Sequence, residues 1–119
     1  MPPKLFVVTL WAEDVNTCAH FYRDAIGLRL IDVHADQPHF DLGGANLGIR
    51  KTRSAPLRAR DFDRFPIVAF SIDDLDAAID RLQQHHIDLP WGVEADNGGR
   101  WIMFYDPGGN LIELTQRTV

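Results

Sequence analysis

An internal repeat constrains the fold of this chain more than any other feature of its sequence. Residues 8–15 and 68–75 share one pattern of apolar and acidic residues. Residues 40–47 and 104–111 also match, and both segments contain an aspartate followed by a pair of glycines. Repetition of this kind is the signature of one supersecondary unit used more than once. We therefore expect two similar structural units in tandem.

Each unit has the pattern of a strand, a helix and three further strands. An alternating apolar segment comes first, at 5–11 in one unit and at 67–72 in the other. An aspartate follows it, Asp14 or Asp74, at the position of a helix N-cap, and apolar residues then recur at helical spacing. Glycine-rich turns separate the later strands. The sequence thus predicts an α+β fold made of tandem βαβββ units.

The boundaries of the two units follow from the same pattern. We expect one unit at about 4–50 and the other at about 66–117, within a single domain that covers 1–119. The connector, 51–65, is rich in arginine and contains two of the aspartates. Nucleic-acid-binding proteins usually carry a basic face over a whole domain, whereas the rest of this chain is acidic. A solvated loop is the favoured interpretation, and no nucleic-acid partner is expected.

Composition limits the environment of the chain. Its hydrophobic fraction of 45% is that of an ordinary globular protein, and no apolar run approaches the length of a membrane span. The single cysteine, Cys18, lies on the apolar side of the predicted helix and permits no internal disulfide. We expect a cytoplasmic protein with no membrane partner and with a buried, inert thiol.

Three segments resemble one protein family. Residues 21–28 are similar to the end of the first helix of the vicinal oxygen chelate superfamily, which includes glyoxalases, bleomycin-resistance proteins and extradiol dioxygenases. Residues 70–78 resemble the entry to its second helix, and residues 105–114 resemble its closing hairpin. The resemblance implies a mixed sheet that curls into a cup, with the helices on its convex side. It also implies a homodimer.

Strand alternation assigns side chains to the two faces of this sheet. The residues expected to pack on the helices are Phe6, Val8, Leu10, Val68, Phe70, Ile72, Ile102, Phe104, Ile112 and Leu114. Those expected to face the cup are Leu5, Val7, Thr9, Trp11, Ile67, Ala69, Ser71, Trp101, Met103, Tyr105 and Glu113.

The resemblance also indicates where a metal would bind. The positions that carry the ligands in metal-dependent members correspond to Val7, Gly48, Ile67 and Glu113. Only Glu113 has a side chain that can coordinate a metal, and an open catalytic site needs about three protein ligands. We expect no cofactor and no divalent metal. A rearranged site would use His39, Asp41 and Glu113.

The predicted cup suits an organic ligand, because a mostly apolar lining with few polar groups is typical of small-molecule sites. The expected ligand-binding residues are Val7, Thr9, Trp11, His39, Arg50, Ile67, Trp101, Met103, Tyr105 and Glu113. Interfaces between subunits also favour such aromatic residues. The preferred function is ligand binding of the kind found in antibiotic-resistance proteins. The alternative is a lyase, epimerase or dioxygenase that uses a rearranged metal site or Glu113 as a general base.

Overall fold

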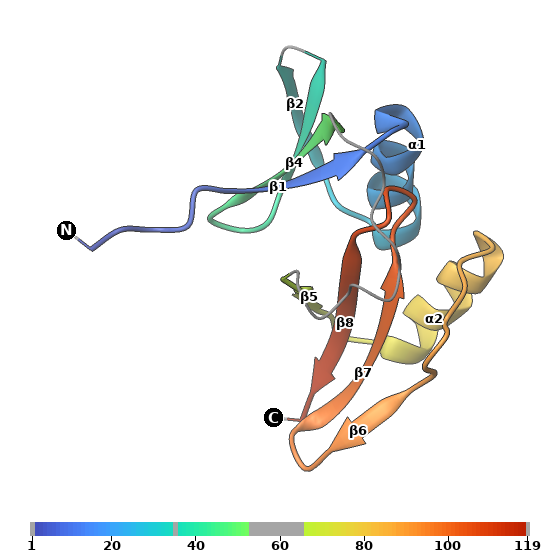
Figure 1. The fold of residues 1–119 in the computed structure, drawn as a ribbon. Helices are drawn as coiled ribbons and strands as arrows, with labels where there is room; N and C mark the ends of the chain where they lie inside the picture. Colours follow the sequence, from blue (N-terminus) through green and yellow to red (C-terminus); the bar gives the residue numbers. More distant parts are fainter. Residues whose placement is uncertain (1, 35, 53–65, 119) are drawn as a thin grey trace. The chain divides into compact units, whose positions relative to one another are not determined.

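The computed structural model describes residues 2–34, 36–52 and 66–118 (Figure 1). The chain divides into two compact units, Met1–Ala55 and Pro56–Val119, here called unit 1 and unit 2. Most of the predicted connector, residues 53–65, lies outside the described residues.

Unit 1 is a four-stranded mixed sheet with one helical segment. Its elements are β1 (Val7–Ala12), α1 (Val15–His20), the π-helical turn η1 (Phe21–Ile26), β2 (Leu30–His34), β3 (Gln37–Asp41) and β4 (Asn46–Lys51). The strand order is β1-β4-β3-β2. The first and last strands, β1 and β4, run parallel, and the other neighbours are antiparallel.

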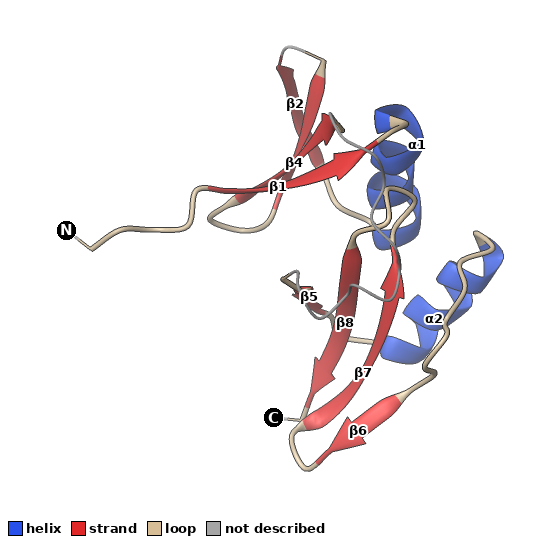
Figure 2. Ribbon diagram, in the orientation of Figure 1, coloured by secondary structure: helices blue, strands red, loops and turns tan. Residues whose placement is uncertain are grey.

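Unit 2 repeats this arrangement (Figure 2). Its elements are β5 (Val68–Ser71), α2 (Leu75–Gln84), β6 (Glu94–Asp96), β7 (Gly99–Tyr105) and β8 (Leu111–Arg117). The strand order is β5-β8-β7-β6, with β5 parallel to β8. The predicted α+β class and tandem βαβββ pattern are therefore confirmed. None of the helices in the described residues is both long and apolar enough to cross a membrane.

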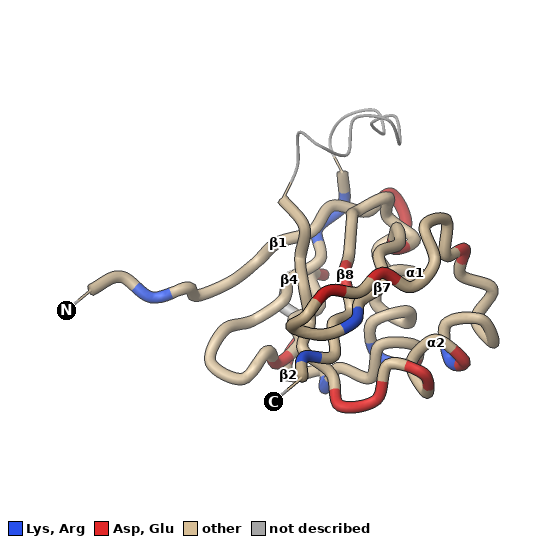
Figure 3. The backbone as a smooth tube through the Cα atoms, turned by 90° about the horizontal axis from the view of Figure 1, so that it is seen from below, with Lys and Arg blue, Asp and Glu red and all other residues tan. Residues whose placement is uncertain are grey.

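Both helices begin at the predicted aspartate caps. The Oδ1 atom of Asp14 accepts a hydrogen bond from the Thr17 backbone N–H at 3.0 Å, and Asp74 accepts one from Ala77 at the same distance. The Thr17 hydroxyl also donates to Asp14 and, with that backbone N–H, lowers the pKa of the carboxyl group. Asp76 adds negative charge in the first turn of α2, where the helix dipole favours it. Figure 3 marks the acidic and basic positions along the backbone.

The first helix changes its winding before it ends. Beyond His20 the chain forms the π-helical turn η1, in which the N–H of Gly27 donates to the carbonyl oxygen of Tyr22, five residues earlier. Gly27 then adopts a left-handed conformation, with φ of 89°, and ends the helix as its sequence position predicts. The wide turn accompanies burial of two adjacent aromatic residues, Phe21 and Tyr22.

The core of each unit lies between its sheet and its helix, as the alternation predicts. The buried strand residues are Leu10, Phe40, Leu47, Ile49, Ile102, Phe104, Ile112 and Leu114. Cys18 is fully buried, in agreement with the expected inert thiol. Val8, Val68, Phe70 and Ile72 are only half-buried, because β1 and β5 are edge strands of their sheets.

Phe6 does not pack on the helix, and this prediction was wrong. Its side chain is 77% exposed. The reason is that β1 begins only at Val7, so Phe6 lies in the extended segment before the strand. The alternating sequence pattern therefore extends one residue before the first residue of the strand, and it does not predict the burial of that residue.

The two glycine-rich hairpins share one chemistry but differ in burial. Asp106 is 4% exposed, and its Oδ1 atom accepts hydrogen bonds from the backbone N–H groups of Gly108, at 2.8 Å, and Asn110, at 2.9 Å. The Asn110 amide donates to both of its carboxylate oxygens. In unit 1, Asp41 accepts from Gly43 in the equivalent turn but remains partly exposed.

Replacing Asp106 should destabilise the protein strongly. We expect Asp106→Ala to lower the free energy of unfolding by about 2–4 kcal/mol, because several half-buried donors lose a buried acceptor. Urea denaturation followed by circular dichroism would measure this loss. Asp41→Ala is the matched control and should cost clearly less, because water can replace its carboxylate. Equal losses for the two variants would contradict the role assigned to burial.

Candidate functional site

Each sheet has one face that its helix covers and an opposite face that the helix leaves bare. We call the bare faces open face 1 and open face 2, for units 1 and 2. The pairing register of the strands shows which residues lie on each open face, because directly paired residues point to the same side of the sheet. Open face 1 contains Val7, Thr9, Trp11, His39, Asp41, Gly48 and Arg50. Open face 2 contains Ala69, Ser71, Trp101, Met103, Tyr105 and Glu113.

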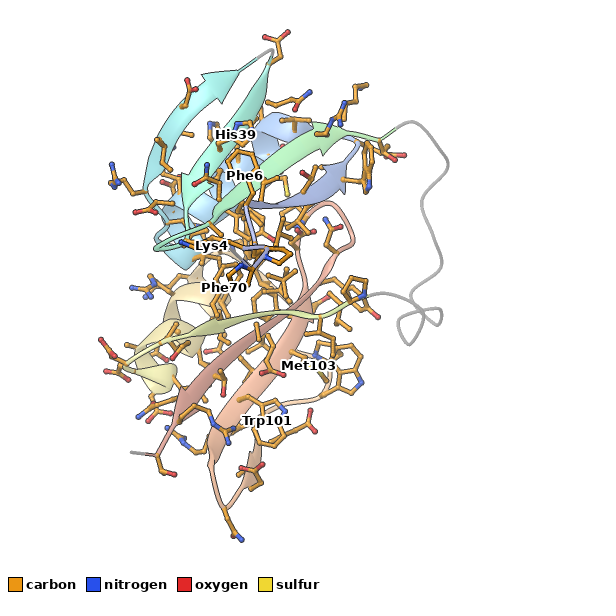
Figure 4. All side chains as sticks on the ribbon, turned by 90° about the vertical axis from the view of Figure 1, so that its left-hand side faces the viewer. Lys4, Phe6, His39, Phe70, Trp101 and Met103 are labelled. Carbon is orange, nitrogen blue, oxygen red and sulfur yellow. The ribbon has the colours of Figure 1, made fainter. Side chains whose placement is uncertain are left out.

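Open face 2 is mainly aromatic and apolar around one carboxylate. Glu113 on β8 has Ala69 of β5 on one side and Met103 of β7 on the other. Trp101 and Tyr105 follow along β7 at alternate positions, and all of these β7 side chains are half-buried. Figure 4 shows Trp101 and Met103 rising from the same strand. A flat ring can rest on such a surface while Glu113 meets a polar group.

Trp91 joins this face although the sequence did not indicate it. Its ring lies 5.7 Å from the ring of Tyr105, centre to centre, with an interplanar angle of 53°. Trp91 belongs to the irregular segment between α2 and β6, and its side chain is 39% exposed. No periodicity assigns a face to a loop residue, so only the folded structure could place it. Ile67, predicted for the same face, lies just before β5 and is 46% exposed.

Open face 1 is more polar and carries a cation. The guanidinium carbon of Arg50 lies 5.6 Å from the ring centre of Trp11, a cation–π distance, and the two residues are register partners. His39 pairs with Gly48 across β3 and β4. A Cβ atom built on Gly48 would lie only 3.1 Å from both Cδ2 and Nε2 of His39. The imidazole therefore occupies the space that a side chain at position 48 would need.

The register also tests the metal positions that the sequence suggested. Thr9 pairs with Gly48 in unit 1, and Ala69 pairs with Glu113 in unit 2. Because Thr9 and Ala69 are equivalent in the repeat, Gly48 occupies the place of Glu113. Val7, Gly48 and Ile67 offer no donor atom, and His39 already fills the space at Gly48. The residues present at these positions do not fit a divalent metal.

In the rearranged ligand set, one carboxylate already has other partners. The carboxylate of Asp41 is engaged at both oxygens, by the Gly43 N–H at 2.9 Å and by Arg29 at 3.2 Å. These contacts, the Gly43 bond first, lower the pKa of Asp41. His39 and Asp41 belong to unit 1, whereas Glu113 belongs to unit 2. Within residues 2–34, 36–52 and 66–118, no group of three or more His, Cys, Asp or Glu side chains could hold a metal ion.

A groove of about 1100 Å³ lies in unit 1, away from the predicted ligand-binding residues except Arg50. One wall is the start of α1, including Val15 and Ala19, and the other is the hairpin of β2 and β3, including Val33 and Phe40. Exposed apolar residues on the edge strand β2, Leu30 and Val33, form part of it. The helix pattern indicated which side of α1 is apolar, but it could not show that β2 leaves this space.

Two repeated βαβββ units, each with one sheet face left bare by its helix, define the class of α+β proteins to which this chain belongs. The chain belongs to the Glyoxalase/Bleomycin resistance protein/Dioxygenase superfamily, whose family model matches residues 4–114. The resemblance stated from the sequence is thereby confirmed.

Solved structures of similar fold come from several bacteria. A glyoxalase/dioxygenase from Nostoc punctiforme matches with a TM-score of 0.83 and 24% identity, over 98% of this chain and 92% of that one. The genomically encoded fosfomycin resistance protein FosX of Listeria monocytogenes matches with a TM-score of 0.79 and 22% identity, over 100% and 97%. TnmS3, an antibiotic binding protein from Streptomyces sp. CB03234, matches with a TM-score of 0.76 and 21% identity, over 98% of both chains. At these identities the likeness shows the fold.

The packing of His39 over Gly48 predicts that substitutions at these two positions have coupled effects on stability. We expect Gly48→Ala to lower the free energy of unfolding by about 1 kcal/mol, because the new methyl group would press on the imidazole, which would have to shift by a small distance. In a His39→Ala background the same substitution should be neutral or slightly stabilising, since alanine restricts the unfolded chain more than glycine. A double-mutant cycle measured by urea denaturation would give the coupling. Additive effects would show that the ring does not occupy this space.

Proposed function

We propose that this protein binds a small organic molecule on open face 2 and does so without a divalent metal. The observation that carries the proposal is the half-buried surface of Trp101, Met103 and Tyr105 around the carboxylate of Glu113. Apolar surface with one polar group is typical of small-molecule sites. The nearby ring of Trp91 extends this surface beyond the sheet.

The aromatic residues favour a planar ligand. Stacking of a ring on Trp or Tyr adds about 0.5–1.5 kcal/mol beyond the burial of apolar area. The flexible thioether of Met103 can adapt to an irregular ligand surface. Glu113 would accept a hydrogen bond from an N–H or O–H group and so fix the orientation of the ligand.

The metal-free part of the proposal rests on side-chain chemistry. Hydrocarbon stands at Val7 and Ile67, where an imidazole would be required, and Gly48 has no side chain. A single carboxylate, Glu113, would leave a divalent ion coordinated mainly by water. A binding protein needs no such ion, because the aromatic side chains provide the affinity.

Known members of the superfamily support a role in resistance to a toxic compound. TnmS3 is an antibiotic binding protein, and FosX is a fosfomycin resistance protein. By analogy, this chain would sequester a bulky natural product. The homodimer and the cytoplasmic location stay predictions, because they concern features beyond a single chain.

A second candidate function uses the same surface for catalysis. Glu113 lies in the middle of open face 2, between the side chains of Ala69 and Met103. A carboxylate in that position could serve as a general base toward a bound substrate, as in a metal-free lyase or epimerase. Glu113→Gln separates the two functions, since it would abolish turnover in the enzyme while a binding protein would still bind its ligand.

Metal content tests the metal-free proposal directly. After incubation with zinc, nickel, cobalt, manganese or anaerobic ferrous iron, followed by desalting, we expect no stoichiometric metal. Elemental analysis by mass spectrometry would measure it. One metal per chain that is lost in both His39→Ala and Glu113→Gln would instead establish the rearranged site and favour an enzyme.

Binding of a neutral aromatic probe tests the surface itself. We expect 2-naphthamide to bind the protein, and Trp101→Ala to weaken its affinity about tenfold, because a stacking surface and apolar area are lost. Isothermal titration calorimetry would measure the affinity. Ile79→Ala is a control, since Ile79 lies on α2, the helix on the opposite side of the sheet from open face 2, and is only half-buried. Equal affinities of both variants, or no binding to the wild type, would refute the proposed site.

A further inference from the structure

We infer that open face 1 binds the anionic group of an aromatic carboxylate, with Arg50 as the residue that holds it. This inference rests on the proposed function in unit 2 only in one respect, namely that the protein takes an organic ligand. It goes further by naming the charge of the ligand and by adding a binding surface in unit 1. The residues that carry it are Arg50, Trp11, Thr9, Gly48 and His39.

Among the described arginines, Arg50 lacks the aspartate partner that most of the others have. Each of the arginines Arg23, Arg29, Arg100 and Arg117 forms an ion pair with an aspartate, at 2.8 to 3.8 Å. Among the described residues, no carboxylate lies within ion-pair distance of Arg50. Arg50 is nevertheless half-buried. A partly desolvated guanidinium gains most from a bound anion, because its charge is only partly screened by water.

Trp11 holds this guanidinium in place. The 5.6 Å separation between the Arg50 guanidinium carbon and the Trp11 ring centre restricts the arginine side chain. Less conformational freedom is then lost when an anion binds. The planar N–H groups of arginine match a carboxylate in a two-point contact, which a single ammonium group cannot reproduce.

Beside this pair the sheet surface carries a hydroxyl group and an imidazole. Thr9 and Gly48 are register partners on β1 and β4, two residues before Trp11 and Arg50 along the strands. Thr9 is exposed and has a hydroxyl group that can donate a hydrogen bond. The imidazole of His39 lies over the Gly48 position, on the side of β3. A planar ring can therefore lie over Thr9, beside this imidazole, while its carboxylate meets Arg50.

Acidic residues near this surface do not compete for Arg50. Asp41 shares open face 1 but is already paired with Arg29 and bonded to Gly43. Asp32 is the cross-strand partner of His39 and lies on the edge strand β2, with two strands between it and β1. Lys51, which follows Arg50, donates to the carbonyl oxygen of Glu13. Within the described residues, Arg50 is thus a cation of this face that forms no ion pair with an aspartate or glutamate.

The test compares two probes of the same shape that differ in charge, 2-naphthoate and 2-naphthamide. Calorimetry on the wild-type protein should show about tenfold tighter binding of the carboxylate. Arg50→Gln should remove this preference while binding of 2-naphthamide remains. Arg50→Lys should restore only part of it, because it keeps the charge but not the planar fork. Arg81→Gln is the matched control, since Arg81 is an exposed arginine of α2 and should leave the preference unchanged.

Nuclear magnetic resonance locates the carboxylate without relying on a variant. Of the tryptophan indole N–H signals, that of Trp11 should shift on addition of 2-naphthoate. A Trp11 signal that does not respond, or equal affinities for the two probes in the wild type, would overturn the inference. Displacement of 2-naphthoate by inorganic phosphate as readily as by benzoate would also overturn it, since the site would then prefer any oxyanion. Failure of the proposed function has a different result, namely 2-naphthamide binding that is absent or insensitive to Trp101→Ala.

Discussion

The parallel pairing of the first and last strands in each unit is the constraint on which the rest of the structure depends. β1 pairs with β4, and β5 pairs with β8. Parallel strands cannot be joined by a tight turn, so the chain must cross one face of the sheet. The helix after the first strand makes part of that crossing and covers the face with apolar side chains. The opposite face is left bare, and there the side chains are free to serve a ligand.

Duplication gave both units this geometry, but their open faces diverged. Gly48 occupies in unit 1 the place that Glu113 holds in unit 2, and His39 fills the space above the glycine. Open face 1 therefore combines a cation and an imidazole, whereas open face 2 combines aromatic rings with a carboxylate. Gly48 offers no side-chain donor atom, whereas the imidazole of His39 can form hydrogen bonds. One backbone frame thus supports two different chemistries, because alternation separates the residues that fold the sheet from those that face outward.

The two hairpin turns have similar sequences but contribute differently to the stability of the protein. Asp41 and Asp106 both accept a hydrogen bond from a glycine two residues later. Only Asp106 is buried, at 4% exposure, and only its turn has an asparagine that bonds the carboxylate twice. A buried acceptor cannot be replaced by water, so the turn of unit 2 contributes more to stability. Sequence comparison recognises the shared turn, whereas burial depends on what surrounds it.

Local rules were enough to determine much of this protein from its sequence. Some features depend only on neighbours along the chain, namely the period of two in the strands, the caps Asp14 and Asp74, and the αL glycine Gly27. These features predicted the α+β class, the repeat and most of the strand residues that lie on each open face. Tertiary structure alone decided the other features, such as the Trp91–Tyr105 contact, the Arg50–Trp11 stacking, the His39 ring over Gly48 and the exposure of Phe6. The physical reason is that these contacts join residues on different strands or loops, and side-chain packing in space has no period along the sequence.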